Sequence, residues 1–204
     1  MERSAVHHDA RVLADNFRYH RMIRYPEACV PWVMGQELGW VVCSPLDITL
    51  SPVREVQIAA GDDQLQEAGR LLGRSEFWRR GDGFIATERN DWARAYQFRG
   101  TEGGWEAMFL PNGAGTVEWR LGWGIRIPAD SLLLVTGLDD SPGVRVPTGV
   151  MTGRQINRTW DGAGFSLAIE PTAVVTLHKG QPIARLVLLG RDSVQASIEE
   201  RGDA

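Results

Sequence analysis

Lysine, cysteine and long apolar runs are all scarce in this sequence, and each shortage excludes a class of function. Lys179 is the single lysine beside 21 arginines in 204 residues, which excludes a lysine-rich membrane or nucleic-acid surface and leaves one candidate for Schiff-base chemistry. The net charge of −4 also argues against nucleic acid, which needs a clustered basic surface. No apolar stretch reaches the roughly 18 residues of a membrane-spanning helix, and the N-terminus lacks the apolar run of a signal peptide. We therefore expect a soluble cytoplasmic protein without a membrane partner.

The sequence also lacks the spacings that announce a metal or a cofactor. Cys29 and Cys43 are the only cysteines; two thiols cannot make a four-cysteine zinc site, and we expect both to be free. No His-x-His, Cys-x-x-Cys or His-Glu-x-x-His spacing occurs, and the nucleotide-binding glycine loops and the Gly-x-Ser-x-Gly elbow are absent as well. We predict a protein that needs no metal and no cofactor.

The clearest pattern that is present runs over residues 116–127. Alternate positions are apolar without an error, which is typical of a half-buried strand. Gly122 and Gly124 both fall on the polar face, where glycine marks a bend or a close approach by another backbone or a ligand. We expect a bent strand whose polar face carries a Glu118–Arg120 pair and is the first place to look for a pocket. The apolar face would comprise Val117, Trp119, Leu121, Trp123, Ile125 and Ile127.

The rest of the chain is mostly short strands at regular spacing. Residues 30–40 predict a short helix, because Pro31 suits a helix start and Gly39 a helix end. Many short strands with few helices indicate an all-β jelly roll, or a distorted barrel or sandwich. We predict one domain with an N-terminal arm at 1–29 and a main β core at 105–190. The expected strands are 38–44, 47–51, 53–59, 105–111, 116–127, 131–137, 144–151, 164–169, 173–178 and 182–190.

Residues 61–104 interrupt this pattern. The segment opens with a possible helix near Asp62 and then mixes charge, glycine and aromatic residues without a period. A structureless stretch of this length is unusual in a compact domain, so we interpret it as an irregular insertion with a functional role or a lid. Its aromatic and arginine side chains would pack it down or line a ligand, with packing the favoured role: Trp78, Arg79, Arg80, Trp92 and Tyr96.

Two resemblances arise from the motifs. The pieces GWVVCSPLDI, LGWGIRIP, the GVM hairpin and KGQPIARLVL, across about 30–190, resemble a bacterial domain-of-unknown-function family. The C-terminal stretches IPADSLLLVTGLD, GVMTGRQINRTWDGAGFSLAI and HKGQPIARLVLL resemble, over fewer residues, the trimeric jelly-roll group of dUTPases and dCTP deaminases. The second resemblance implies a trimer.

The chemical positions of that group have changed in this chain. Val135 stands where the triphosphatases carry an arginine that binds phosphate, Thr152 where they carry the aspartate that activates water, and Arg185 where they carry a glutamine. Threonine cannot act as the general base that phosphorus chemistry requires. We expect a shared scaffold and no hydrolysis of dUTP or dCTP.

Residues 152–160 are predicted as a hairpin rich in ligand-binding side chains. Arginine clamps carboxylates or phosphates, asparagine reads amide-like edges, and tryptophan stacks on flat rings. A polar surface hairpin explains the segment equally well. With the polar face of the central strand, we predict ligand contacts from Arg120, Trp123, Arg126, Arg154, Asn157, Trp160 and Arg185.

Glu118 and His178 are the candidates for moving a proton. A solvated or subunit-facing ion-pair row also explains Glu118 beside its arginines, and an ordinary surface histidine at a strand end also explains His178.

The leading functional hypothesis is a small-molecule-acting protein, a cofactor-independent tailoring enzyme on an anionic or aromatic metabolite. The alternative is a non-catalytic oligomeric assembly or ligand-binding module on a dUTPase-like scaffold. Either would form a homo-oligomer, with a trimer favoured.

Overall fold

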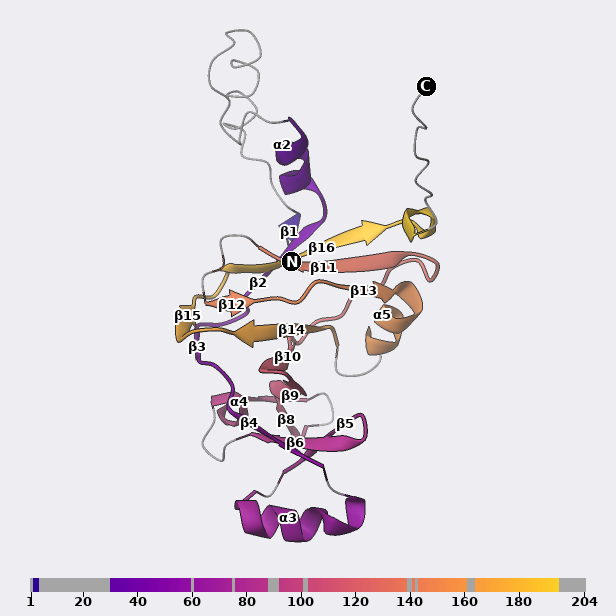
Figure 1. Ribbon diagram of the computed structural model, residues 1–204. Coiled ribbons are helices and arrows are strands. Elements are labelled where there is room, and N and C mark those ends of the chain that lie inside the picture. The colour runs from indigo at the N-terminus through magenta and orange to yellow at the C-terminus, as the bar shows by residue number, and fades with distance from the viewer. Residues whose placement is uncertain are drawn as a thin grey trace, which may run out of the picture.

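The computed structural model describes residues 2–3, 30–59, 61–74, 76–87, 92–100, 103–138, 141, 143–160 and 164–194. Short strands dominate and form several antiparallel sheets with a few short helices, and the described strands close no barrel (Figure 1). The predicted all-β class is confirmed. None of the helices among the described residues is both long and apolar enough to cross a bilayer. The predicted N-terminal arm, with Cys29, lies outside the described residues except for 2–3.

The main sheet has five strands. Their order is β1 (Glu2–Arg3), β2 (Trp40–Cys43), β16 (Pro182–Leu189), β11 (Leu132–Gly137) and β13 (Gly149–Thr152). Residues 131–137 were predicted to be buried on both faces, but in β11 only Leu133 and Val135 are buried, while Leu132 and Leu134 stay half-exposed. The sheet is therefore covered on one side, and its other side keeps an apolar surface. The helix α2 (Val30–Glu37) precedes β2.

A second sheet packs against the covered side. Its order is β12 (Val144–Arg145), β14 (Ser166–Pro171), β10 (Thr116–Arg120) and β9 (Phe109–Gly113). A two-stranded sheet joins β15 (Val175–Leu177) to β3 (Ile48–Leu50). We call these sheets together the sandwich. Its core holds the fully buried side chains of Trp119, Phe109, Leu167, Leu133 and Leu186.

The predicted twelve-residue central strand is shorter than expected. β10 ends at Arg120, and Gly122 adopts a φ of 75°, a left-handed conformation that glycine accepts without steric cost. The apolar alternation nevertheless continues, since Leu121 and Ile125 are both buried. At Gly124 the close approach comes from a side chain and not from the backbone or ligand that was expected: a Cβ there would lie 2.8 Å from the Trp160 ring.

The described residues of 61–104 contain more regular structure than predicted. They form η2 (Asp62–Gln64), α3 (Leu65–Leu72), β5 (Trp78–Arg80), β6 (Gly83–Thr87), α4 (Trp92–Ala95) and β7 (Gln97–Arg99). β6 pairs with β5 and with β4 (Glu55–Ile58), and β7 pairs with β8 (Trp105–Ala107). The alternation of apolar and polar residues could not be recognised in the sequence because each of these strands has only three to five residues. We call β4, α3, β5 and β6 the small lobe; it lies below β9, with α3 farthest from the sandwich (Figure 1).

The hairpin predicted at 152–160 is wrong beyond Thr152, because α5 (Gly153–Trp160) is a helix. Thr152 caps it: the Gln155 amide nitrogen donates to Thr152 Oγ1, and Gln155 Oε1 accepts from the Thr152 amide at 2.9 Å. This reciprocal pair is a capping box. Glycine is required at 153, because a Cβ there would lie 2.1 Å from the Pro128 carbonyl oxygen. The last element is η3 (Arg191–Val194).

Candidate functional site

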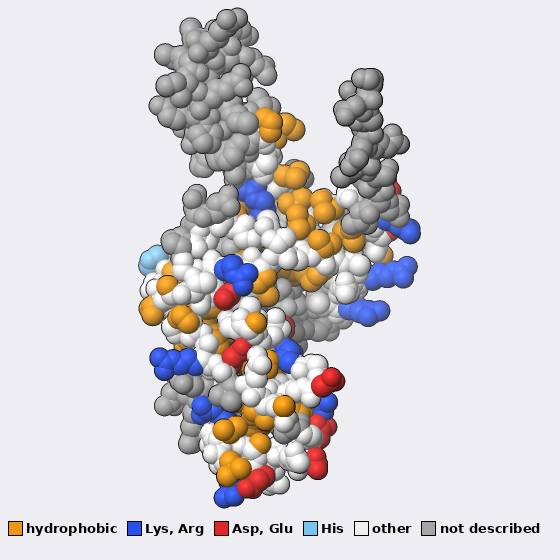
Figure 2. Space-filling view, viewed as in Figure 1, with side chains coloured by type: hydrophobic (Ala, Val, Ile, Leu, Met, Phe, Trp, Pro, Cys, Tyr) orange, Lys and Arg blue, Asp and Glu red, His pale blue; other side chains and the backbone are white. Residues whose placement is uncertain are grey.

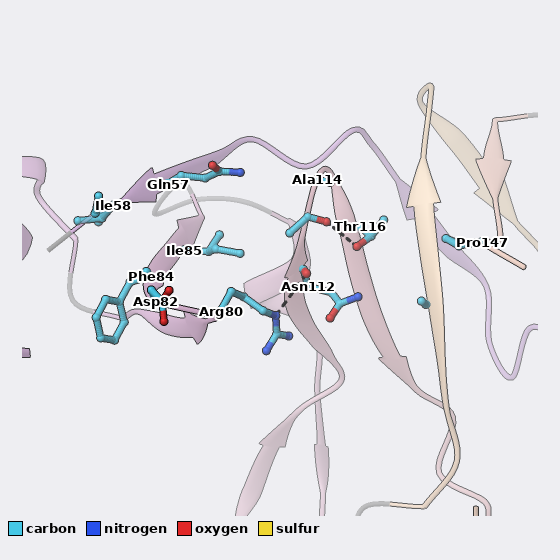
Figure 3. A pocket seen from close by; sticks show the side chains of 14 residues that line it. Gln57, Ile58, Arg80, Asp82, Phe84, Ile85, Asn112, Ala114, Thr116 and Pro147 are labelled. Atoms are coloured by element: carbon cyan, nitrogen blue, oxygen red, sulfur yellow. Dashed lines mark hydrogen bonds between the residues drawn. The ribbon is translucent and has the colours of Figure 1, made fainter. Parts of the chain in front are cut away.

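An open groove of about 790 Å³ lies where the small lobe meets the β9–β10 hairpin (Figure 3). Its walls come from β4, the β5–β6 hairpin, the β9–β10 hairpin, Pro147 and Ala168 of β14. Buried Ile85 forms an apolar floor, and a Cβ at Gly113 would lie 3.1 Å from its Cδ1. Phe84, next to it on β6, points to the other face of the strand, where its ring lies 4.9 Å from the Arg79 guanidinium. The volume falls within the range of roughly 300–1,000 Å³ that small-molecule sites occupy.

The β9–β10 turn that borders the groove is held in an unusual conformation. Gly113, Ala114 and Gly115 all have positive φ, at 91°, 53° and 74°. Alanine pays about 1–2 kcal/mol for this conformation, and such strain tends to gather at binding sites. The turn is anchored from both sides: Thr116 Oγ1 donates to the Gly113 carbonyl at 2.6 Å, and the Gly115 amide donates to Glu55 Oε1 at 3.0 Å.

Arg80 ties the small lobe to this hairpin. Its guanidinium donates to the carbonyl oxygens of Pro111 at 2.8 Å and Asn112 at 3.3 Å. Among the described residues no carboxylate forms an ion pair with it. Carbonyl oxygens carry only partial charge, so Arg80 keeps a full positive charge at the rim of the groove.

Three polar side chains at the rim have no hydrogen-bond partner within the described parts of the chain. They are Gln57, Asp82 and Asn112, and all three are exposed. Figure 3 shows them on three sides of the groove, with Asp82 on the β5–β6 turn near Arg80. Each can therefore bond to a ligand without first breaking a protein contact.

Glu118 is the predicted proton carrier nearest to the groove. In the β10–β14 register it lies directly opposite Ala168, which lines the groove, and two residues after Thr116, which also lines it. Side chains two apart on a strand share a face, so Glu118 continues the polar wall beyond the lining residues. It is half-buried and has no ion pair or hydrogen bond to another described side chain.

The other predicted residues of the central segment contact other parts of the fold and do not line the groove. Arg120 forms its ion pair with Glu106 at 3.2 Å, where a pair with Glu118 was expected. The Trp123 ring stacks on Phe165 with centroids 5.2 Å apart. Arg126 lies over the Trp160 ring, 4.8 Å from its centroid, so the structure brings these two predicted ligand contacts together.

Asn157 and Arg185 both bind backbone groups. Asn157 accepts from the Ile127 amide at 3.1 Å and donates to the Ile127 carbonyl at 2.9 Å, in the manner of a neighbouring strand. Arg185 donates to the carbonyls of Gly35 and Leu38, at the end of α2. Cations are favourable at a helix C-terminus. Arg154 is exposed on α5 and lies away from the groove.

His178 lies at the β15–β16 turn and does not line the groove. Its Nδ1 contacts Asp47 Oδ1 at 3.2 Å, and the same oxygen accepts from the Lys179 amide at 3.1 Å. The backbone bond from Lys179 and then the side-chain bond from His178 lower the pKa of Asp47 below its ordinary value. This group fastens a surface turn to the loop before β3.

The groove residues were mostly missed because they belong to the segment without a period. Arg80 was considered there, with packing preferred, and the structure gives it both a packing role and a place at the groove. Residues 112–115 lie between the predicted strands 105–111 and 116–127, but nothing local indicates that β4 and β6 face them. Within the described residues no three His, Cys, Asp or Glu side chains gather as metal ligands.

A second open cavity, of about 570 Å³, lies beyond Pro147, which borders both cavities. It is formed by the end of β11, β12, the segment before β13 and Thr172.

No family model, no curated protein and no solved structure matches this chain.

Proposed function

We propose that the protein binds a small-molecule ligand in the groove between the small lobe and the β9–β10 hairpin. The observation that carries the proposal is an apolar floor at Ile85 below polar side chains that lack partners among the described residues. Apolar walls with a few well-placed polar groups are typical of ligand sites. A ring or chain of the ligand would lie on the floor, and its polar groups would bond to Arg80 and Asp82.

Both charge signs at the rim favour a ligand that carries both an acceptor and a donor. Arg80 would take a carboxylate or another acceptor, while Asp82 would take a donor. This narrows the predicted anionic or aromatic metabolite to one that also carries an N–H or O–H group. Tight binding would come from the floor, since burying apolar surface contributes about 25 cal/mol per Å².

The test compares a groove-filling variant with a matched surface variant. Ala168→Met places a larger side chain in the groove, whereas Val174→Met adds the same side chain at an exposed position outside it. A metabolite library screened by thermal shift should yield ligands that stabilise the wild type and Val174→Met by about 2–4 kcal/mol at 100 to 1,000 times Kd. The same ligands should have no effect on Ala168→Met. A library without a single stabilising compound, or equal shifts in both variants, contradicts the proposal.

A tailoring reaction on the bound ligand is the catalytic form of this proposal, and Glu118 favours it. A half-buried carboxylate without a side-chain partner, next to the groove, can take a proton from a ligand. His178 is not available for this role at the groove because it lies at the β15–β16 turn. Mass spectrometry of each ligand after incubation measures turnover. Loss of turnover in Glu118→Gln with binding retained supports catalysis by Glu118. If the wild type returns every ligand unchanged, the protein binds ligands without converting them.

Self-assembly is the second candidate, favoured by the side of the main sheet that the described residues leave partly uncovered. Leu134 and Val150 are paired on two strands of that side; Leu134 is half-exposed and Val150 is 52% exposed, whereas Val187, which faces Leu134 from β16, is buried. Met34 and Leu38 at α2 add side chains that are 62% and 57% exposed. Figure 2 shows hydrophobic side chains gathered around α2 and over the strands beneath it. Such a patch fits a second copy of the chain.

Light scattering tests this assembly. With the trimer implied by the resemblance, the wild type should have the mass of three 22.6 kDa chains, and Val150→Asp should have the mass of one. Val174→Asp, at an exposed position outside this surface, should remain a trimer. A wild-type mass of a single chain at micromolar concentration contradicts the assembly and leaves the groove proposal intact.

A further inference from the structure

Four of the eleven residues that line the second cavity carry hydroxyl groups. Thr136, Ser141, Thr148 and Thr172 surround it, with Arg145 on one side. Thr136 and Thr148 lie within 3.3 Å of each other through their Oγ1 atoms. Each hydroxyl offers one donor and two acceptor positions, so this cavity can bond to groups that both donate and accept.

The charge of this cavity is balanced. Arg145 is the one charged side chain among its described lining residues, and its guanidinium binds Glu170 through Nε and Nη2. An anion would have to compete with that carboxylate for Arg145. Hydroxyl groups of a ligand need no counter-charge, so the balance favours an uncharged polar group.

The two cavities follow one another along β14. Ala168 lines the groove, Thr172 lines the second cavity, and Glu170 lies between them on the same side of the strand. Glu170 also connects the walls: Oε2 binds Arg145, and Oε1 is 4.0 Å from the position of a Cβ at Gly115. At about 3.3 Å per residue, Ala168 and Thr172 are roughly 13 Å apart along the strand.

From this arrangement we infer that the two cavities take the two ends of one elongated ligand. An apolar ring or chain lies in the groove, and an uncharged polyhydroxylated group, sugar-like in its chemistry, lies in the second cavity and passes over Pro147. The inference rests on the proposed function, since it extends the ligand already placed in the groove. It adds the chemical class of the second half and a length of about 13 Å.

Phenyl glycosides of glucose, galactose and mannose are the probes, with phenol and the free sugars as their separate halves. In amide NMR titrations, phenol should shift residues around Gly113, and at least one sugar should shift residues around Thr172. The matching phenyl glycoside should shift both sets and bind at least tenfold more tightly than either half, because the second contact becomes intramolecular.

Two hydroxyl deletions form a matched pair. Thr172→Val removes a hydroxyl from the second cavity at nearly constant shape and should reduce the affinity of the glycoside to that of phenol. Ser193→Ala removes an exposed hydroxyl from η3, outside both cavities, and should change nothing.

The outcomes separate this inference from the proposed function. Glycosides that shift only the groove and bind like phenol, with no effect of Thr172→Val, overturn the inference and support the groove. Inorganic phosphate shifting the second cavity where no sugar does makes it an anion site and also overturns the inference. If neither cavity responds to any probe, the inference fails, and so does the proposal that the groove binds an aromatic ring.

Discussion

The sandwich and the small lobe use burial in different ways. In the sandwich, large side chains from both sheets are fully buried, among them Trp119, Phe109 and Leu167. Among the described side chains of the small lobe, the buried apolar ones are Phe84, Ile85 and Ala86, all on β6. One buried strand cannot support an independent core, so the lobe depends on its contact with β9. That contact is also the border of the groove.

The difference extends to polar groups. In and around the sandwich, Asn157 and Arg185 bind backbone groups within the fold, although buried Trp119 Nε1 lacks an acceptor among the described residues. At the groove, Gln57 and Asp82 remain exposed without such partners. Interactions already made in the protein cannot add to binding, so Asn157 and Arg185 offer less affinity for a ligand than Gln57 and Asp82 do.

The largest expected effect is the loss of the central ring of the sandwich. Trp119→Ala should lower the free energy of unfolding by about 3–5 kcal/mol, because it removes buried surface and leaves a cavity. Trp119→Phe should cost less, since it keeps a ring against Phe109 and removes the partnerless N–H. Urea denaturation measures both. A loss in Trp119→Ala no greater than in Phe84→Ala would erase the contrast between the two regions.

A second expected effect tests how tightly α5 is joined to the sandwich. Gly153→Ala should cost about 1–3 kcal/mol, because the new Cβ must push away the Pro128 carbonyl. Gly149→Ala is the control: no atom lies within 4 Å of its Cβ position, and its stability should change by less than about 1 kcal/mol. Thermal unfolding that ranks the two variants equally would show that α5 moves freely.

Removing the tie between the lobe and β9 should have a smaller and local effect. Arg80→Ala deletes three bonds to backbone carbonyls, two of them to β9. A net loss of about 1 kcal/mol should accelerate amide hydrogen exchange about fivefold in β5 and β6. Exchange in β11 and β16 should be unchanged. Arg70→Ala, which loses only an exposed pair with Glu67, should leave both regions as they are. Equal acceleration across the sandwich would argue that lobe and sandwich unfold as one unit.

The smallest effect concerns the pH dependence of the Asp47–His178 contact, between the loop before β3 and the β15–β16 turn. The pKa of Asp47 is depressed in the fold, so its contribution to stability is present above the unfolded-state value, near 4, and is lost as pH falls through the lower folded value. In NMR titrations, His178→Ala should raise the pKa of Asp47 only part of the way, because the bond from the Lys179 amide is the larger cause. A complete return to the ordinary value would assign the whole effect to His178.

Several features could be predicted from the sequence because they depend on neighbours in the chain. The alternation over 116–127 predicted which side chains are buried, and burial at Val117, Trp119 and Leu121 follows it. Thr152 and Gln155 have the spacing of a capping box, which could have predicted α5. Short strands without a period, such as β5 and β7, carried too few residues to be recognised.

The sequence by itself determined the all-β class and the buried face of the central segment, because hydrophobic periodicity is a property of neighbouring residues. Only the tertiary structure decided where a ligand could bind. Gln57, Asp82, Asn112 and Ala168 are far apart in the chain and meet because β6 packs against β9 and β14 pairs with β10. The same packing took Asn157 and Arg185 out of the candidate site by giving them backbone partners. Long-range strand pairing decides which polar groups remain available to a ligand, and local sequence patterns do not predict that pairing.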